Sequence, residues 1–157
     1  MGLYRELVAA RPDAFRADLA MALNNLANGL SALGRREEAL AAAQEAVGLY
    51  RDLAAIRPDA FRPNLAISLM SKAGVLDGVG KFDDALIDNA EALEFERIQF
   101  EQYPAASAPR LSWMIDEYIA RCEKCCREAD WELLGPLIEA LRRLQGREKD
   151  AGGQANG

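Results

Sequence analysis

The sequence repeats itself after 46 residues, and this repetition limits the possible folds more than any other feature. Residues 4–49 and 50–95 align without a gap and share 20 of 46 residues. The opening of each copy is nearly the same, YRELVAARPDAFRADLA and then YRDLAAIRPDAFRPNLA. A weaker third copy keeps few residues at the same offset, among them Arg97, Pro104, Pro109 and Leu111. Tandem units of this length predict a stack of one repeated structural element, with an atypical unit at its end.

Each copy is expected to form two helices joined by a tight turn. Leucines in the first half of the first copy are spaced by three or four residues, which is the helical period. These leucines are Leu19, Leu23, Leu26, Leu30 and Leu33. Gly34 is expected to end this helix, as Gly80 does in the second copy. Ala and Leu are frequent and β-branched residues are sparse, so the sequence predicts an all-α fold.

Prolines mark the expected starts of the first helices, because a proline cannot continue a preceding helix. Pro12 and Pro58 occupy this place, with Asp13 and Asp59 as the expected caps. We expect one domain over residues 1–145, followed by a polar, glycine-rich tail over 146–157 that is disordered. Within the domain the expected parts are a truncated helix over 3–11, a first repeat over 14–57, a second repeat over 60–103 and a degenerate third repeat over 108–145.

The composition argues against several classes of function. A formal net charge of −6 disfavours binding to nucleic acids and to anionic membrane surfaces. No apolar run approaches the ~20 residues of a membrane span, and the first residues lack a signal peptide's apolar stretch. A cytoplasmic protein is therefore expected. Histidine, the commonest general base and metal ligand, is absent, and no phosphate-binding or nucleophile motif occurs. We expect no enzymatic activity, no cofactor and no metal.

The three cysteines fall in one short segment. Cys122, Cys125 and Cys126 have the spacing of a single helical face. They offer three thiolates, with neither a histidine nor a second cysteine pair to complete a metal site. Burial as small apolar side chains is the favoured interpretation, and a metal or redox site is the less favoured one.

The repeated helix pair resembles the tetratricopeptide repeat. The residues that carry the resemblance are Leu23, Leu26, Ala27, Leu30, Gly34, Ala39, Ala43 and Ala46, followed by Leu69, Ala73, Leu76, Gly80, Ala85 and Ala92. Lys72 and Asn89 depart from the pattern, which usually has apolar or small residues there. The period exceeds the usual ~34 residues and is similar to the kinesin-light-chain-like variety of actinobacterial regulatory proteins. The resemblance implies a short right-handed α-solenoid, and we expect it to be the C-terminal part of a larger regulatory protein.

The same resemblance implies a concave wall lined by the first helix of each unit. On that helix Leu23, Leu26, Ala27 and Leu30 are expected to face the core, and the stripe on the other side is the expected partner-binding surface. Its members are Met21, Asn24, Asn28 and Ser31, with Asn25 beside them, and the offset of 46 carries the stripe to Ile67, Met70 and Asp77 and then to Trp113 and Asp116. Amides can hold a peptide backbone, methionine adapts to varied partners and tryptophan anchors them. We therefore expect a scaffold that binds a peptide or helix of a partner protein.

Two other interpretations stay open. The asparagines can instead bond to neighbouring helices and fix the stacking, and Trp113 can instead cover the end of the core. The ends of the array can also pair with a second copy, which would make the chain a homodimer and an oligomerisation element. The apolar residues expected at these ends are Leu3, Leu7, Leu137 and Leu141.

Overall fold

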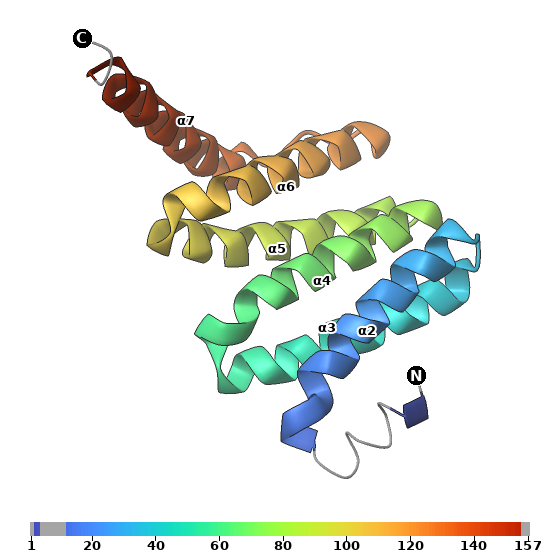
Figure 1. The fold of residues 1–157 in the computed structure, drawn as a ribbon. Coiled ribbons are helices and arrows are strands. Elements are labelled where there is room, and N and C mark those ends of the chain that lie inside the picture. The colour runs from blue at the N-terminus through green and yellow to red at the C-terminus, as the bar shows by residue number, and fades with distance from the viewer. Residues whose placement is uncertain (1, 4–11, 155–157) are drawn as a thin grey trace.

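The computed structural model describes residues 2–3 and 12–154, and residues 12–154 form helices that stack one after another (Figure 1). The described helices are α2 (Pro12–Ala32), α3 (Arg36–Ile56), α4 (Pro58–Gly78), α5 (Phe82–Gln102), α6 (Pro104–Lys124) and α7 (Trp131–Gln154). Each helix packs against the next along the chain, and the described residues include no strand. The predicted all-α repeat solenoid is confirmed. The truncated helix expected over 3–11 lies almost entirely outside the described residues.

The helix bounds follow the period of the sequence. The first helices begin at Pro12, Pro58 and Pro104, and each spans 21 residues. The first helix of the third unit therefore keeps the bounds that the period predicts although few of its residues match, whereas its second helix, α7, begins only at Trp131. The repeats begin two to four residues earlier than expected, because proline takes the first helical position, where its fixed φ fits and no N–H is needed. Asp59 is consequently not the cap of α4; Arg57 holds that position without a side-chain hydrogen bond.

The turn after each first helix has a left-handed residue at the same place. Gly34 has φ +74° and Gly80 has φ +77°, which confirms their expected role as helix ends. The next N–H bonds back to the helix in both turns, from Arg35 to the Leu30 carbonyl and from Lys81 to the Leu76 carbonyl, each at 2.9 Å. The third turn repeats this geometry with Cys126 instead of glycine (φ +53°).

Small residues let the helices of the first unit approach closely. Ala27, Ala39, Ala43 and Ala46 are fully buried, and a larger side chain at these positions would separate the helices. Two of the regularly spaced leucines are not buried, and one of them, Leu26, was expected to face the core. Leu26 is 37% exposed and Leu33 is 75% exposed, because the side of α2 on which they lie is not the side packed on α3.

The C-terminal end of the stack differs from expectation in two ways. The last helix was expected to end at Gln145, whereas α7 continues to Gln154, since Gly146 in a helix costs only about 1 kcal/mol and good helix formers follow it. The second difference concerns the leucines expected to be exposed at this end. Leu137 is 2% exposed and Leu141 packs against the core, because α7 turns its apolar side toward the stack.

Candidate functional site

The first helices of the three units together form a hollow on one side of the stack. The larger part has a volume of about 580 Å³ and is lined by residues of α2, α4 and α6. A second part of about 240 Å³ lies beside it toward the start of the chain. The two parts share Asn28, Ile67 and Ser71, so they form one continuous groove.

Most of the expected partner-binding residues line this groove. They are Met21, Asn24, Asn25, Asn28, Ile67, Met70 and Trp113. Asp77 and Asp116 are not part of the lining. Helical periodicity and the 46-residue offset selected these side chains, and the concave wall implied by the family resemblance brought the three helices to one surface.

The groove lining contains exposed apolar side chains. Met21 is 54% exposed, and Ile67 and Trp113 are each 47% exposed. Met70 was also expected to be available to a partner, and this prediction is wrong. Met70 is only 3% exposed and belongs to the main core cluster. The reason is that α4 packs against helices on both sides, so its side chains are more enclosed than their counterparts on α2.

The asparagines connect α2 to the next unit. Ser68 Oγ donates a hydrogen bond to Asn24 Oδ1 at 2.9 Å, and Ser71 Oγ donates one to Asn28 Oδ1 at 2.6 Å. The stacking interpretation is therefore confirmed for these amide oxygens. Asn28 remains exposed, and within the described residues neither amide nitrogen donates a hydrogen bond to the protein. Each side chain thus keeps two N–H donors free.

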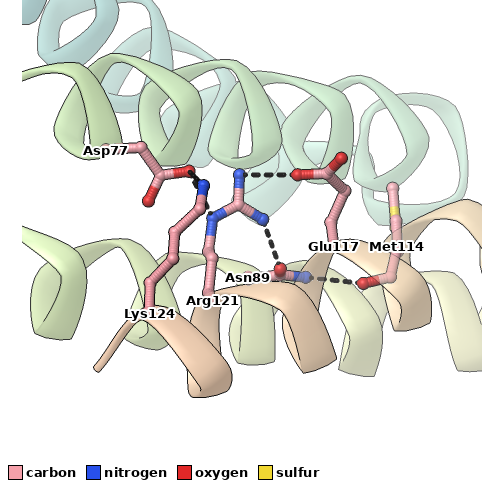
Figure 2. A network of polar contacts seen from close by, with 6 residues as sticks. All are labelled: Asp77, Asn89, Met114, Glu117, Arg121 and Lys124. Atoms are coloured by element: carbon pink, nitrogen blue, oxygen red, sulfur yellow. Dashed lines mark hydrogen bonds and ion pairs between the residues drawn. The ribbon is translucent and has the colours of Figure 1, made fainter. Parts of the chain in front are cut away.

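A buried arginine is part of the groove lining, and it is the centre of a network of polar contacts (Figure 2). Arg121 is 2% exposed, and its Nε donates to Asp77 Oδ2 at 2.9 Å. Its Nη1 donates to Asn89 Oδ1 at 2.6 Å, and its Nη2 lies 3.2 Å from Glu117 Oε2. Asn89 Nδ2 in turn donates to the Met114 carbonyl at 3.2 Å. This network joins α4, α5 and α6, so Asp77 stabilises the stack instead of facing the groove.

Polar contacts between neighbouring helices account for the two departures from the repeat pattern, Lys72 and Asn89. Asn89 is buried because it accepts from Arg121, and Lys72 reaches Asp88 of the neighbouring helix at 3.0 Å. Burial raises the pKa of the Asp88 carboxyl, and the hydrogen bond and charge of Lys72 oppose that rise. Sequence reasoning missed Arg121 as a groove residue. The available signal was the pair of Glu117 and Arg121, which stand four residues apart on one helical face.

The cysteines do not share one helical face. Cys122 is buried in α6, Cys125 is partly buried and Cys126 is exposed, because α6 ends at Lys124. Burial raises the pKa of the Cys122 thiol. All three thiols are free, and the described part of the chain contains no group of three or more Cys, Asp or Glu side chains placed to hold a metal ion.

The sequence model of one protein family, described as tetratricopeptide repeat, matches residues 19–54. These residues cover most of α2 and α3. This part of the chain is therefore similar to a tetratricopeptide repeat. The second helix pair has the bounds of the first shifted by 46 residues, so it has the same tetratricopeptide-like architecture. No curated protein and no solved structure gives a significant match. Over residues 2–3 and 12–154, none of the helices has the length and apolarity needed to cross a membrane.

Proposed function

We propose that this chain is a protein-interaction scaffold that binds a peptide or helix of a partner protein in the groove across α2, α4 and α6. Tetratricopeptide repeats generally mediate contacts between proteins. The observation that carries the proposal is the continuous hollow, which exposes apolar side chains from all three first helices. In this proposal the scaffold acts by binding its partner.

The groove offers a partner two kinds of contact. Met21, Ile67 and Trp113 present apolar surface along its length, and each of them can bury a partner's apolar side chain. Asn28 offers N–H donors between these apolar residues, which suits the carbonyl groups of an extended backbone. The partner is therefore a segment with spaced apolar side chains. We propose that the scaffold works in the cytoplasm and that its repeats are of the kinesin-light-chain-like variety.

A displayed peptide library tests the groove when it is selected against the purified chain. Selected peptides are labelled and their affinities are measured by fluorescence anisotropy. Ile67→Glu and Trp113→Ala are expected to weaken binding by about 30-fold or more, as for a central interface residue. Two matched controls lie outside the groove lining: Ile87→Glu on α5 and Trp131→Ala on α7, where the side chains are 66% and 62% exposed.

The proposal requires that the groove variants lose affinity while the controls keep it, with unchanged helical circular dichroism in all four. Peptides that bind Ile67→Glu as tightly as the unchanged chain would place the binding surface elsewhere. A library that yields no binding peptide at all would also contradict the proposal.

A further inference from the structure

The part of the groove that α6 forms combines an exposed aromatic ring with a carboxylate. Trp113 is exposed and lines the groove, and Glu117 lines it with a side chain that is 40% exposed. The two residues stand four positions apart in one helix, so their side chains are neighbours on its surface. Asp116 is also exposed on α6, three residues after Trp113, although it does not line the groove. We call Trp113 and Glu117 the aromatic–acidic pair.

The Glu117 carboxylate can accept a second cation. Its Oε2 lies 3.2 Å from Arg121 Nη2, and no donor in the described residues bonds to its Oε1. Arg121 directs its other donors at Asp77 and Asn89, at 2.9 and 2.6 Å (Figure 2). The charge of Arg121 is therefore divided between two carboxylates. Because a carboxylate has about four lone-pair sites, a cation from a partner can bind Glu117 without breaking the existing ion pair.

An anionic partner, by contrast, finds no free cation on the described first helices. Glu117 and Arg121 are the charged residues of the groove lining, and Arg121 is 2% exposed with its donors already engaged. Each of the other lysines and arginines on α2, α4 and α6 has a carboxylate within 4.0 Å. These pairs are Arg16–Asp52, Arg62–Asp59, Lys72–Asp88, Arg110–Glu96 and Lys124–Asp77. The charge that the groove presents to a partner is therefore negative.

We propose that the segment bound in the groove carries a lysine or arginine whose cation lies over the Trp113 ring and pairs with Glu117. This basic residue is an addition to the function proposed above and rests on it. Tryptophan is the best aromatic partner for a cation, because the face of its ring carries a negative partial charge. The carboxylate supplies the opposite charge at the edge of the same site. Asp116 adds attraction during the approach of a basic partner.

The rest of the groove indicates what accompanies the basic residue. Ile67 of α4 is exposed in the same hollow as the aromatic–acidic pair, and Met21 is exposed further toward the start of the chain. No charged residue lies among the described lining residues of α2 and α4. The partner segment is therefore expected to have its basic residue at the α6 end and apolar residues along the remainder.

Three displayed peptide libraries test the charge. They share the same random apolar positions and differ in one fixed central residue, which is arginine, glutamine or glutamate. Each library is selected against the purified chain, and affinities are measured by fluorescence anisotropy. The arginine library is expected to give the tightest peptides. Replacement of that arginine by glutamine in the best peptide is expected to weaken binding about 3- to 30-fold, as for an ion pair and a ring contact together. The difference is expected to shrink between about 0.05 M and about 0.5 M salt.

Glu117→Gln tests the protein side of the contact. In this variant the arginine and glutamine peptides are expected to differ by only about 3-fold or less, since only the ring contact remains. Glu139→Gln is the matched control, because Glu139 pairs with Arg143 four residues later, as Glu117 pairs with Arg121, but lies on α7 outside the groove lining. It is expected to leave the ratio unchanged. A merely structural effect of Glu117→Gln would weaken both peptides alike and would not change this ratio.

The outcomes separate this inference from the function on which it rests. Equal binding by peptides of the three libraries, or a ratio that Glu117→Gln leaves unchanged, would overturn the basic residue and keep the groove as a binding surface. A preference for the glutamate library would overturn it in the same way. If none of the libraries yields a binding peptide, both the basic residue and the proposed function are contradicted.

Discussion

Replacement of Cys126 by glycine is expected to stabilise the protein, because Cys126 has a backbone conformation that favours glycine. Its φ is +53°, and the same turn in the two earlier units is made by Gly34 and Gly80 with φ of +74° and +77°. The turn hydrogen bond is kept in the third unit, from the Arg127 N–H to the Cys122 carbonyl at 2.9 Å. The Cys126 side chain is exposed, so its removal loses little buried surface.

The size of the effect follows from two opposing terms. A left-handed backbone costs a residue with a Cβ about 1–2 kcal/mol relative to glycine. Glycine in turn gives the unfolded chain more freedom, which lowers stability by about 0.4–1 kcal/mol. The expected net gain for Cys126→Gly is about 0.5–1 kcal/mol, which corresponds to a rise of about 1–4 °C in melting temperature for a chain of this length.

Thermal and urea unfolding followed by circular dichroism under reducing conditions measure this gain. Cys126→Ala is the control for loss of the thiol and is expected to leave the stability nearly unchanged, since alanine keeps the Cβ. Gly80→Ala is the reverse experiment and is expected to lose about 0.5–1 kcal/mol. A Cβ at Gly80 would meet no atom within 4 Å, so the loss reports backbone conformation alone. A lower melting temperature for Cys126→Gly, or an equal rise for Cys126→Ala, would refute the reasoning.

Two further predictions concern the buried polar groups. Arg121→Ala is expected to lower the free energy of unfolding by about 1–3 kcal/mol, because it leaves the buried Asn89 amide oxygen and the partly buried Asp77 carboxylate without their donor. Urea unfolding measures this, and Arg143→Ala at an exposed ion pair should change it by no more than about 0.5 kcal/mol. An equal effect of the two substitutions would contradict the role of burial. Asp88 has a raised pKa, so its protonated form favours folding and its contribution is present below pH 3.8 and lost as the pH rises through the raised value. Asp88→Asn does not titrate, so its stability relative to the unchanged chain is expected to increase between pH 3.5 and 7; a difference that is constant with pH would contradict this.

The helix pairs could be predicted because they depend on local signals. The leucine spacing in the first copy, the left-handed Gly34 and Gly80, and the helix-starting Pro58 act within a few residues of the chain. The groove could be predicted in part for the same reason. Helical geometry determines which side chains share a face, and the repeat period carries that face to the next unit, as it does from Met21 to Ile67.

The errors concern side chains whose surroundings depend on other units. Met70 has the same helical position as Asn24, yet it is buried because α4 has a neighbour on each side. Asp77 was assigned to the groove, but Arg121 approaches it from a helix 44 residues further along the chain. Leu26 was assigned to the core and is part of an open face. No local pattern distinguishes these cases, because the sequence of one helix does not contain the identity of its neighbours.

The sequence by itself determined the repeated helix pair, its 46-residue period and the angular position of each side chain around its helix. These properties come from backbone preferences and helical geometry, which act over one or two turns. Only the tertiary structure decided which positions are buried, where Asn24 and Asn28 find their serine partners, and which face of α2 remains open. Burial and hydrogen bonding between units are properties of the stack, and the same helical position therefore has different surroundings in the first, second and third units.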